Sequence, residues 1–342
     1  MRIWIISEGS PGHVSQSLGL ARALGEEHPR QWQTRPRLRG YLRHLIRLLW
    51  MGPRGRALPT WFLKHILALE PIPANEPKPD LIISSGGRSV FAALSLARRH
   101  AVPFVFIGER KPYPSEWFHT VFTPSALETG SRDVRIDLIP TKIDLQTVTT
   151  AAAAWTDRPH GRLWTLLIGG KSRSHQFTTA DWIALARGMT TIARREGIRW
   201  LVTSSRRTGR DTETLLIEHL PPEVIADAVW WCHQPEKKYA AYLGAAELIA
   251  CTQDSVSMLT EAVSTGKPVV ALSPAHTPFP ADSFLPGYLD HLEKMDRLAR
   301  VPIATMTAPG CFRNSPPKPP LDILGDMAAT LTQRLPLPAT TP

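Results

Sequence analysis

The residues best suited to chemistry lie between Glu247 and Leu272, in a polar turn and the helix predicted to follow it. Asp254, Ser255 and Ser257 stand at the start of that helix. Serine hydroxyls and free backbone N–H groups at a helix start can donate to phosphate oxygens. Glu261 follows Ser257 by four residues, on the same helix face and about 6 Å further along the axis. This spacing suits a diphosphate held by the helix start and a ribose held by the carboxylate. The alternative is an ordinary capped helix with a solvated glutamate.

Two short apolar runs, at 248–251 and 268–272, flank this turn and helix. Such runs are typical of strands buried on both faces of a sheet. Residues 256–265 allow about three helical turns, and Gly266 follows where a left-handed residue is favoured. We therefore expect two parallel strands joined by a helix, with the ligand beyond the carboxyl ends of the strands.

Two more polar loops follow predicted strands in the same half of the chain. The strand at 163–168 runs into GGKS, where glycine lets the backbone approach a ligand. The strand at 198–203 runs into SSRRT, and arginine suits bidentate phosphate contact. Either arginine alone would be an ordinary surface residue, whereas two of them beside the other loops favour an anion site. The predicted nucleotide-sugar-binding residues are Gly169, Gly170, Lys171, Ser172, Ser204, Ser205, Arg206, Arg207, Asp254, Ser255, Ser257 and Glu261.

The N-terminal half repeats the pattern of strand, glycine turn and helix. A strand at 2–6 leads through SEGSPG to His13, and a helix is expected from there to residue 24. A neutral imidazole can accept a hydroxyl proton, so His13 is a candidate general base. The alternative is a histidine that caps the helix at the surface. Glu109, after the strand at 103–107, is the alternative carboxylate base. Predicted acceptor contacts, each also explicable as a tight turn, are Gly12, Gly86, Gly87 and Arg88.

Several of these motifs resemble known families. TQDSVSMLTEAVSTGKPV, residues 252–269, resembles the donor-nucleotide motif of two-domain sugar-nucleotide glycosyltransferases and the related non-hydrolysing epimerases. It resembles more closely the signature of the family named after the plant "elongated mitochondria" fission protein, whose bacterial members are described as glycosyltransferases. SPGHVSQSLGLARAL resembles the first loop of bacterial lipid-linked sugar transferases. The resemblance covers residues 3–30 and 160–272, through PGH, LIGG, SSRRT, DSVSM and TGKPV. After residue 272 the sequence departs from the pattern.

The resemblance implies an α/β fold of two doubly wound Rossmann-like domains facing a central cleft, a GT-B-like architecture. A length of 342 residues also fits two domains of about 150 residues each. We expect an acceptor-binding domain at 1–150, a linker near 144–158, a nucleotide-sugar-binding domain at 158–334 and a frayed tail at 335–342. The implied reaction moves a sugar, most simply from a UDP-sugar, to a glycolipid such as lipopolysaccharide core. Alternatives are an epimerase of the same fold and a non-catalytic membrane-associated scaffold.

The amino-acid composition limits the kinds of partner and cofactor that this protein is expected to bind. The formal charge of +10 fits an anionic partner such as a nucleotide or phosphorylated glycolipid, while no motif for nucleic-acid recognition accompanies it. Three scattered cysteines argue against disulfides and zinc, and no Asp-X-Asp pair is present, so no metal or other cofactor is expected. The longest apolar runs are too short for a spanning helix or a signal peptide. We therefore expect a cytoplasmic protein.

One further stretch, residues 36–69, has the pattern of a basic amphipathic helix. Its leucines recur at helical spacing, and Arg39, Arg43 and Arg47 recur every fourth residue on the other side. Trp50, Trp61 and Phe62 are aromatic residues of the kind that lie at the headgroup level. We expect this segment to rest on an anionic membrane surface, peripherally on the inner face of the plasma membrane. The alternative is an ordinary helix that packs its leucines on the first sheet.

Overall fold

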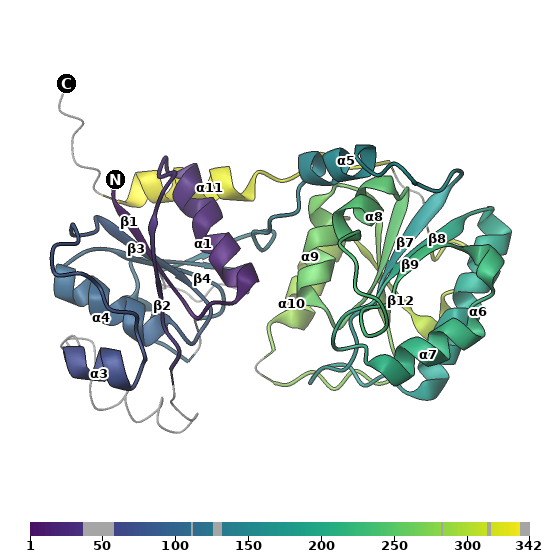
Figure 1. Cartoon of the computed structure of the whole chain (residues 1–342), viewed down its shortest axis with the longest axis horizontal. Coiled ribbons are helices and arrows are strands. Elements are labelled where there is room, and N and C mark those ends of the chain that lie inside the picture. Colours follow the sequence, from purple (N-terminus) through teal and green to yellow (C-terminus); the bar gives the residue numbers. More distant parts are fainter. Residues whose placement is uncertain (37–57, 111, 126–131, 282, 313–315, 336–342) are drawn as a thin grey trace. The chain divides into compact units, whose positions relative to one another are not determined.

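The computed structural model describes residues 1–36, 58–110, 112–125, 132–281, 283–312 and 316–335 (Figure 1). The chain divides into two compact units. The first comprises Met1–Lys142 together with the C-terminal segment from Asp322, and the second comprises Ile143–Leu321. In the described part of the chain, each unit contains one parallel sheet of six strands. The predicted fold class, two doubly wound α/β domains, is confirmed.

In the first unit the strands lie in the order β2-β1-β3-β4-β5-β6, and all neighbours are parallel. The chain runs from β1 outward to β2 and then crosses back to β3, so the winding direction reverses between β1 and β3. The strands are β1 Ile3–Ser7, β2 Arg30–Gln33, β3 Leu81–Ser85, β4 Phe104–Ile107, β5 Thr120–Thr123 and β6 Asp133–Arg135. The helices are α1 Pro11–Ala23, α3 Thr60–His65, α4 Val90–His100, the short 3-10 helix η1 Ser115–Trp117, and α11 Ile323–Arg334.

In the second unit the strand order is β12-β11-β10-β7-β8-β9, again all parallel. Here the winding reverses between β7 and β10. The strands are β7 Leu163–Leu167, β8 Arg199–Thr203, β9 Ile225–Val229, β10 Leu248–Thr252, β11 Val269–Ser273 and β12 Ala299–Pro302. The helices are α5 Leu145–Ala153, α6 Thr179–Glu196, α7 Arg210–His219, α8 Tyr239–Ala245, α9 Val256–Ser264, α10 Leu285–Lys294, and the 3-10 helices η2 Pro222–Val224 and η3 Ile303–Thr305.

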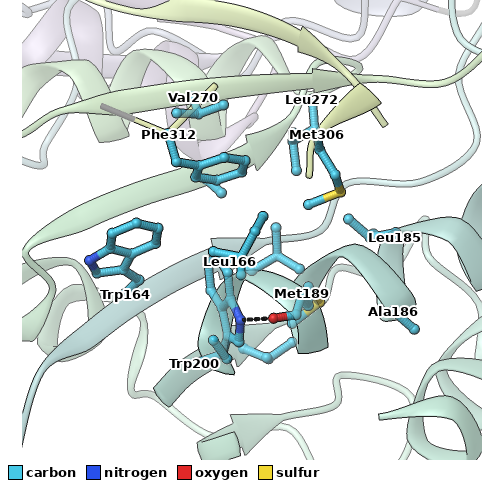
Figure 2. Packing of buried hydrophobic residues seen from close by; sticks show 14 of the residues in the cluster. Trp164, Leu166, Leu185, Ala186, Met189, Trp200, Val270, Leu272, Met306 and Phe312 are labelled. Carbon is cyan, nitrogen blue, oxygen red and sulfur yellow. Dashed lines mark hydrogen bonds between the residues drawn. The ribbon is translucent and has the colours of Figure 1, made fainter. Parts of the chain in front are cut away.

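Large aromatic side chains lie among aliphatic residues and methionines in the core formed by the second sheet and α6 (Figure 2). Trp164 of β7 stacks on Phe312 with ring centroids 5.8 Å apart, and its other neighbour Trp200 of β8 meets it edge-on at 5.8 Å. The indole Nε1 of Trp200 donates to the carbonyl oxygen of Met189 in α6, 2.9 Å away, so this buried polar group is satisfied. Close packing of this kind fixes the strands and therefore the loops at their ends.

The observed units differ from the predicted domain boundaries at both ends of the second domain. Helix α11, predicted to belong to residues 158–334, packs against α1 of the first unit. A Cβ on Gly19 of α1 would lie 2.8 Å from Leu324 Cδ1, so glycine permits this contact. The alanine-rich stretch predicted as a linker is instead helix α5, which packs on α8 in the second unit. A Cβ on Gly244 would lie 2.0 Å from the Val148 carbonyl oxygen.

Part of the predicted amphipathic segment 36–69 falls on residues 37–57, which lie outside the described residues, as do residues 336–342 of the predicted tail. The described end of the segment packs its leucines into the first unit's core: Leu58, Leu63, Leu67 and Leu69 are all buried. Trp61 on α3 is exposed. Among the described helices, none combines the length and the apolar character needed to cross a membrane.

Candidate functional site

The predicted nucleotide loops of the second unit include two that lie where the winding of its sheet reverses, at the carboxyl ends of β7 and β10. Ligands of doubly wound sheets bind at such switch points. The register pairs Leu167 with Cys251, which brings the GGKS loop against the residues before α9. The amide N of Gly169 donates to Thr252 Oγ1 at 2.7 Å. A Cβ on Gly169 would lie 2.3 Å from Asp254 Oδ2, so a larger residue would push these loops apart.

Asp254 joins the three loops that the sequence assigned to the nucleotide. Its Oδ2 atom accepts a hydrogen bond from the Gly170 amide at 3.0 Å and pairs with the Arg207 guanidinium at 2.9 Å. Oδ1 is buried and has no hydrogen-bond partner among the described residues. Burial raises the pKa of this carboxyl to about 6, although Thr252, Arg207 and the Gly170 amide oppose the shift. Asp254 therefore holds the loops together instead of presenting its carboxylate to solvent.

Asp254→Asn should change how stability depends on pH. The folded-state pKa of about 6 lies above the ordinary value of 3.8, so the folded state holds more protons than the unfolded chain between these values. Stability therefore falls as pH rises through this window, by on the order of 3 kcal/mol. The Asn variant lacks this titration. Urea unfolding from pH 4 to 8 measures this. As pH rises from 4 to about 6.5, the wild type should lose stability relative to the Asn variant, and at higher pH the two proteins should show the same pH dependence.

Asp211→Asn is the matched control, because Asp211 is exposed in the same unit. It should run parallel to the wild type throughout. A constant difference between wild type and Asp254→Asn across the whole pH range would contradict the assignment.

The basic residues of this edge are exposed. Arg207 is 42% exposed although it pairs with Asp254, and it also donates to the Lys171 carbonyl oxygen at 3.4 Å. Arg206 and the Lys171 side chain are exposed as well. A Cβ on Gly170, whose φ is +134°, would lie 2.3 Å from the Arg207 carbonyl oxygen, so only glycine fits this crossing. The exposed cations form an edge that can bind an anion.

The serines of these loops have different partners. Ser205 Oγ donates to the Gly169 carbonyl oxygen, and Ser172 Oγ accepts from the His175 amide at 3.1 Å. Ser204 is buried and donates to the buried carboxylate of Glu213 at 2.6 Å. These contacts shape the loops, and the contact to Glu213 occupies the hydroxyl of Ser204.

Helix α9 begins without a side-chain cap. Ser255 occupies the N-cap position, but its hydroxyl makes no capping hydrogen bond, and Ser257 in the first turn is exposed. The alternative predicted a capped helix, and the structure shows no side-chain cap at this helix start. Amides at an uncapped helix start are donors for an anion, and the helix dipole favours negative charge there.

Glu261 lies one turn into α9 and has a partner that the sequence analysis missed. The Tyr239 hydroxyl at the start of α8 donates to Glu261 Oε2 at 2.7 Å. Burial, followed by the charge of Glu261, raises the pKa of Tyr239 well above its ordinary value, so the phenol remains a donor. Tyr239 fixes the orientation of the carboxylate. The two residues stand 22 positions apart, and no local pattern indicated the contact.

His175 is a second residue that sequence reasoning missed. It is fully buried, with Nδ1 3.0 Å from Ser174 Oγ and Nε2 3.4 Å from Gln253 Oε1. Burial lowers its pKa, which keeps the ring neutral at pH 7. Its contact with Gln253 ties the GGKS loop to the turn before α9. In the sequence, the only indication that His175 belongs to the site was its position directly after KSRS.

The first unit has a polar pair at its own switch point, between β1 and β3. The register pairs Ile6 with Ser84, so the loop after β1 faces the SGGRS loop after β3. His13 Nδ1 lies 2.7 Å from Oε1 of Glu8, a residue that the sequence analysis did not single out. Gly86 has φ +87°, and a Cβ there would lie 2.3 Å from Glu8 Oε1 and 2.4 Å from His13 Nδ1. Glycine at this position makes room for the pair.

The other predicted residues of the first unit are more dispersed. Glu109 lies at the end of β4, where Thr123 Oγ1 donates to its Oε1 at 2.8 Å and Ser125 Oγ donates to the same oxygen. Gly12 has open space around it, while the Gly87 carbonyl oxygen accepts from Tyr113 at 3.2 Å. Arg88 is exposed. The structure therefore brings His13 and Gly86 together and places Glu109 one strand beyond β3.

No group of three or more His, Cys, Asp or Glu side chains among the described residues has the geometry of a metal site.

The fold and the polar loops at its two switch points define a class of protein with two doubly wound α/β units. Residues 11–335 match the profile of the family described as Mitochondrial fission ELM1. The match spans nearly the whole sequence, so the chain belongs to this family. None of the curated proteins matches the chain in sequence.

Solved structures of similar fold include the UDP-GlcNAc 2-epimerase of Methanocaldococcus jannaschii in complex with UDP-GlcNAc and UDP. It has a TM-score of 0.53 and 14% identity over 97% of this chain and 100% of that chain. A glycosyltransferase from Rickettsia africae has a TM-score of 0.49 and 9% identity, covering 98% and 99% of the two chains. MurG of Acinetobacter baumannii has a TM-score of 0.48 and 14% identity, covering 97% and 91%. The epimerase comparison establishes a shared two-unit fold.

Proposed function

We propose that this protein is a glycosyltransferase that moves a sugar from a nucleotide-sugar donor, most simply a UDP-sugar, to a glycolipid acceptor. The observation that carries the proposal is the uncapped start of α9 at the β7/β10 switch point, flanked by exposed Arg206 and Arg207. These donors suit a diphosphate, and Glu261, oriented by Tyr239, suits the ribose hydroxyls. The fold shared with an epimerase solved with UDP-GlcNAc and UDP agrees with a nucleotide sugar.

In the proposed reaction, an acceptor hydroxyl attacks the anomeric carbon and the bond to the departing diphosphate breaks. His13 accepts the hydroxyl proton, since its ring lies at the loop edge of the first sheet and is partly exposed. The α9 amides and the two arginines stabilise the negative charge that develops on the diphosphate. Lipopolysaccharide core is the acceptor we propose to test first.

A glycolipid acceptor places the reaction at a membrane. Support for membrane contact is the basic pattern of residues 36–69, of which 37–57 lie outside the described residues. The buried leucines at 58–69 assign that end of the segment to the core, so the proposed membrane contact rests on the arginines earlier in the sequence.

A panel of nucleotide sugars, incubated with the protein with and without lipopolysaccharide core, tests the proposal. Acceptor-dependent release of nucleoside diphosphate is the expected result. Free epimer without transfer would favour the second candidate, a sugar-nucleotide epimerase. The fold shared with the M. jannaschii enzyme supports this candidate. Binding without turnover would favour a non-catalytic scaffold.

Glu261→Gln should weaken UDP binding by about 1–3 kcal/mol, because a charged acceptor for ribose hydroxyls becomes neutral. This corresponds to roughly 5- to 150-fold in Kd. Titration calorimetry with UDP measures the effect. Glu218→Gln, an exposed glutamate on α7 of the same unit, is the matched control and should bind as the wild type does. Unchanged affinity in a folded Glu261→Gln protein would remove Glu261 from the site.

A further inference from the structure

Glu8 and His13 form a hydrogen-bonded pair at the switch point of the first unit. An ionised carboxylate has only acceptor atoms, so the 2.7 Å contact requires that His13 Nδ1 carries the proton and donates it to Glu8 Oε1. The second ring nitrogen, Nε2, is then left with its lone pair. The His13 side chain is 39% exposed and that of Glu8 only 13%. The contact thus lies on the protected side of the ring.

The surroundings of Glu8 hold it in this orientation. Gly86 packs directly against both members of the pair, and a Cβ there would lie 2.3 Å and 2.7 Å from the two oxygens of Glu8. Oε2 is buried and accepts no hydrogen bond from the described residues. A buried carboxylate oxygen without a partner is unfavourable by itself. The hydrogen bond from His13 Nδ1 to the other oxygen, Oε1, partly offsets this cost.

We propose that Glu8 is a positioning residue that fixes the tautomer of His13 and stabilises the charge the ring acquires when it accepts a proton at Nε2. In the transfer step the acceptor O–H bond breaks, the proton goes to Nε2, and the oxygen forms the new bond to the sugar as the diphosphate leaves. Glu8 keeps its negative charge throughout and stays hydrogen-bonded to Nδ1. The part of this inference that concerns turnover rests on the proposed function, whereas the tautomer does not.

The tautomer is measured on the wild-type protein by long-range ¹H–¹⁵N NMR of the histidine rings, with His13→Gln used to identify the His13 signals. The expected result is protonated Nδ1 and unprotonated Nε2. A ring protonated at Nε2 overturns the inference, whether or not transferase activity is found. Glu8→Leu removes both oxygens at similar size and should shift the ring toward protonation at Nε2. Glu8→Gln retains an acceptor oxygen and should preserve the wild-type tautomer at least in part.

If donors are turned over, Glu8→Leu should lower kcat by roughly 10- to 10³-fold, with Glu8→Gln between it and the wild type, and UDP affinity should stay within about twofold. Glu27→Leu, an exposed glutamate of the same unit, is the matched control and should change neither tautomer nor kcat. A folded Glu8→Leu protein that keeps both the wild-type tautomer and kcat would overturn the inference. Absence of turnover in the wild type would count against the proposed function alone.

Discussion

Replacing His13 with alanine should lower the rate of nucleoside diphosphate release by about 10² to 10⁴, the range for losing a general base. Affinity for UDP should stay near the wild-type value, because the donor-side residues belong to the other unit. A split between kcat and donor affinity is the signature of a group that acts on the acceptor proton. The measurement is steady-state kinetics with the donor identified by the panel, combined with calorimetry.

His28→Ala is the matched control for His13→Ala, since His28 is an exposed histidine of the same unit. It should retain full turnover. If His13→Ala is as active as His28→Ala, the base is not His13, and Glu109 becomes the candidate. Its carboxylate is already oriented by the hydroxyls of Thr123 and Ser125, so Glu109→Gln would then be the variant that loses turnover.

Lys267→Met should destabilise the second unit by about 2–4 kcal/mol, which lowers Tm by roughly 5–15 °C. The ammonium of Lys267 donates to three carbonyl oxygens at the end of α8: Leu243 at 2.8 Å, Gly244 at 2.6 Å and Ala246 at 2.6 Å. Three donors meet three helix-end acceptors that have no partners within the helix. Methionine keeps the length of the side chain but leaves these carbonyls without a donor.

Differential scanning calorimetry of Lys267→Met against Lys237→Met, an exposed lysine of the same unit, isolates this effect. Equal Tm values for the two variants would show that the hydrogen bonds contribute nothing net. The stability difference between the wild type and Lys267→Met should also depend on pH. Burial lowers the pKa of Lys267 from 10.5 to about 8, so the unfolded chain holds more protons between these values. Stability of the wild type should therefore rise relative to Lys267→Met as pH increases from 8 to 10.

The order of strands, turns and helices could be read from the sequence for local physical reasons. Short apolar runs bounded by glycine and polar residues predict buried strands. Glycine after the apolar helix at 256–264 marks its end, and the observed φ of Gly266 is +74°. The same logic located both glycine loops, GGKS and SGGRS, which the structure places at the two switch points. Each of these inferences uses residues within a few positions of one another.

The boundaries between the two units could not be predicted from such local patterns. Alanines at 151–154 resemble a linker in composition, yet in the fold their small size lets α5 pack closely on α8, where Gly244 leaves room for the Val148 carbonyl. Helix α11 follows the second unit in sequence but packs beside α1, at the opposite end of the chain. Packing between elements far apart in sequence decides both cases, and periodicity within a single helix carries no information about its partner.

The sequence by itself determined the two-unit α/β architecture and which loops gather at the ends of the parallel strands. The tertiary structure decided what each polar side chain does there. Asp254, predicted to face a nucleotide, is buried between Gly170 and Arg207, while Glu8, which the pattern did not single out, holds His13. The physical reason is that a strand edge specifies where a side chain lies, whereas its protonation and orientation depend on burial and on partners contributed by other strands.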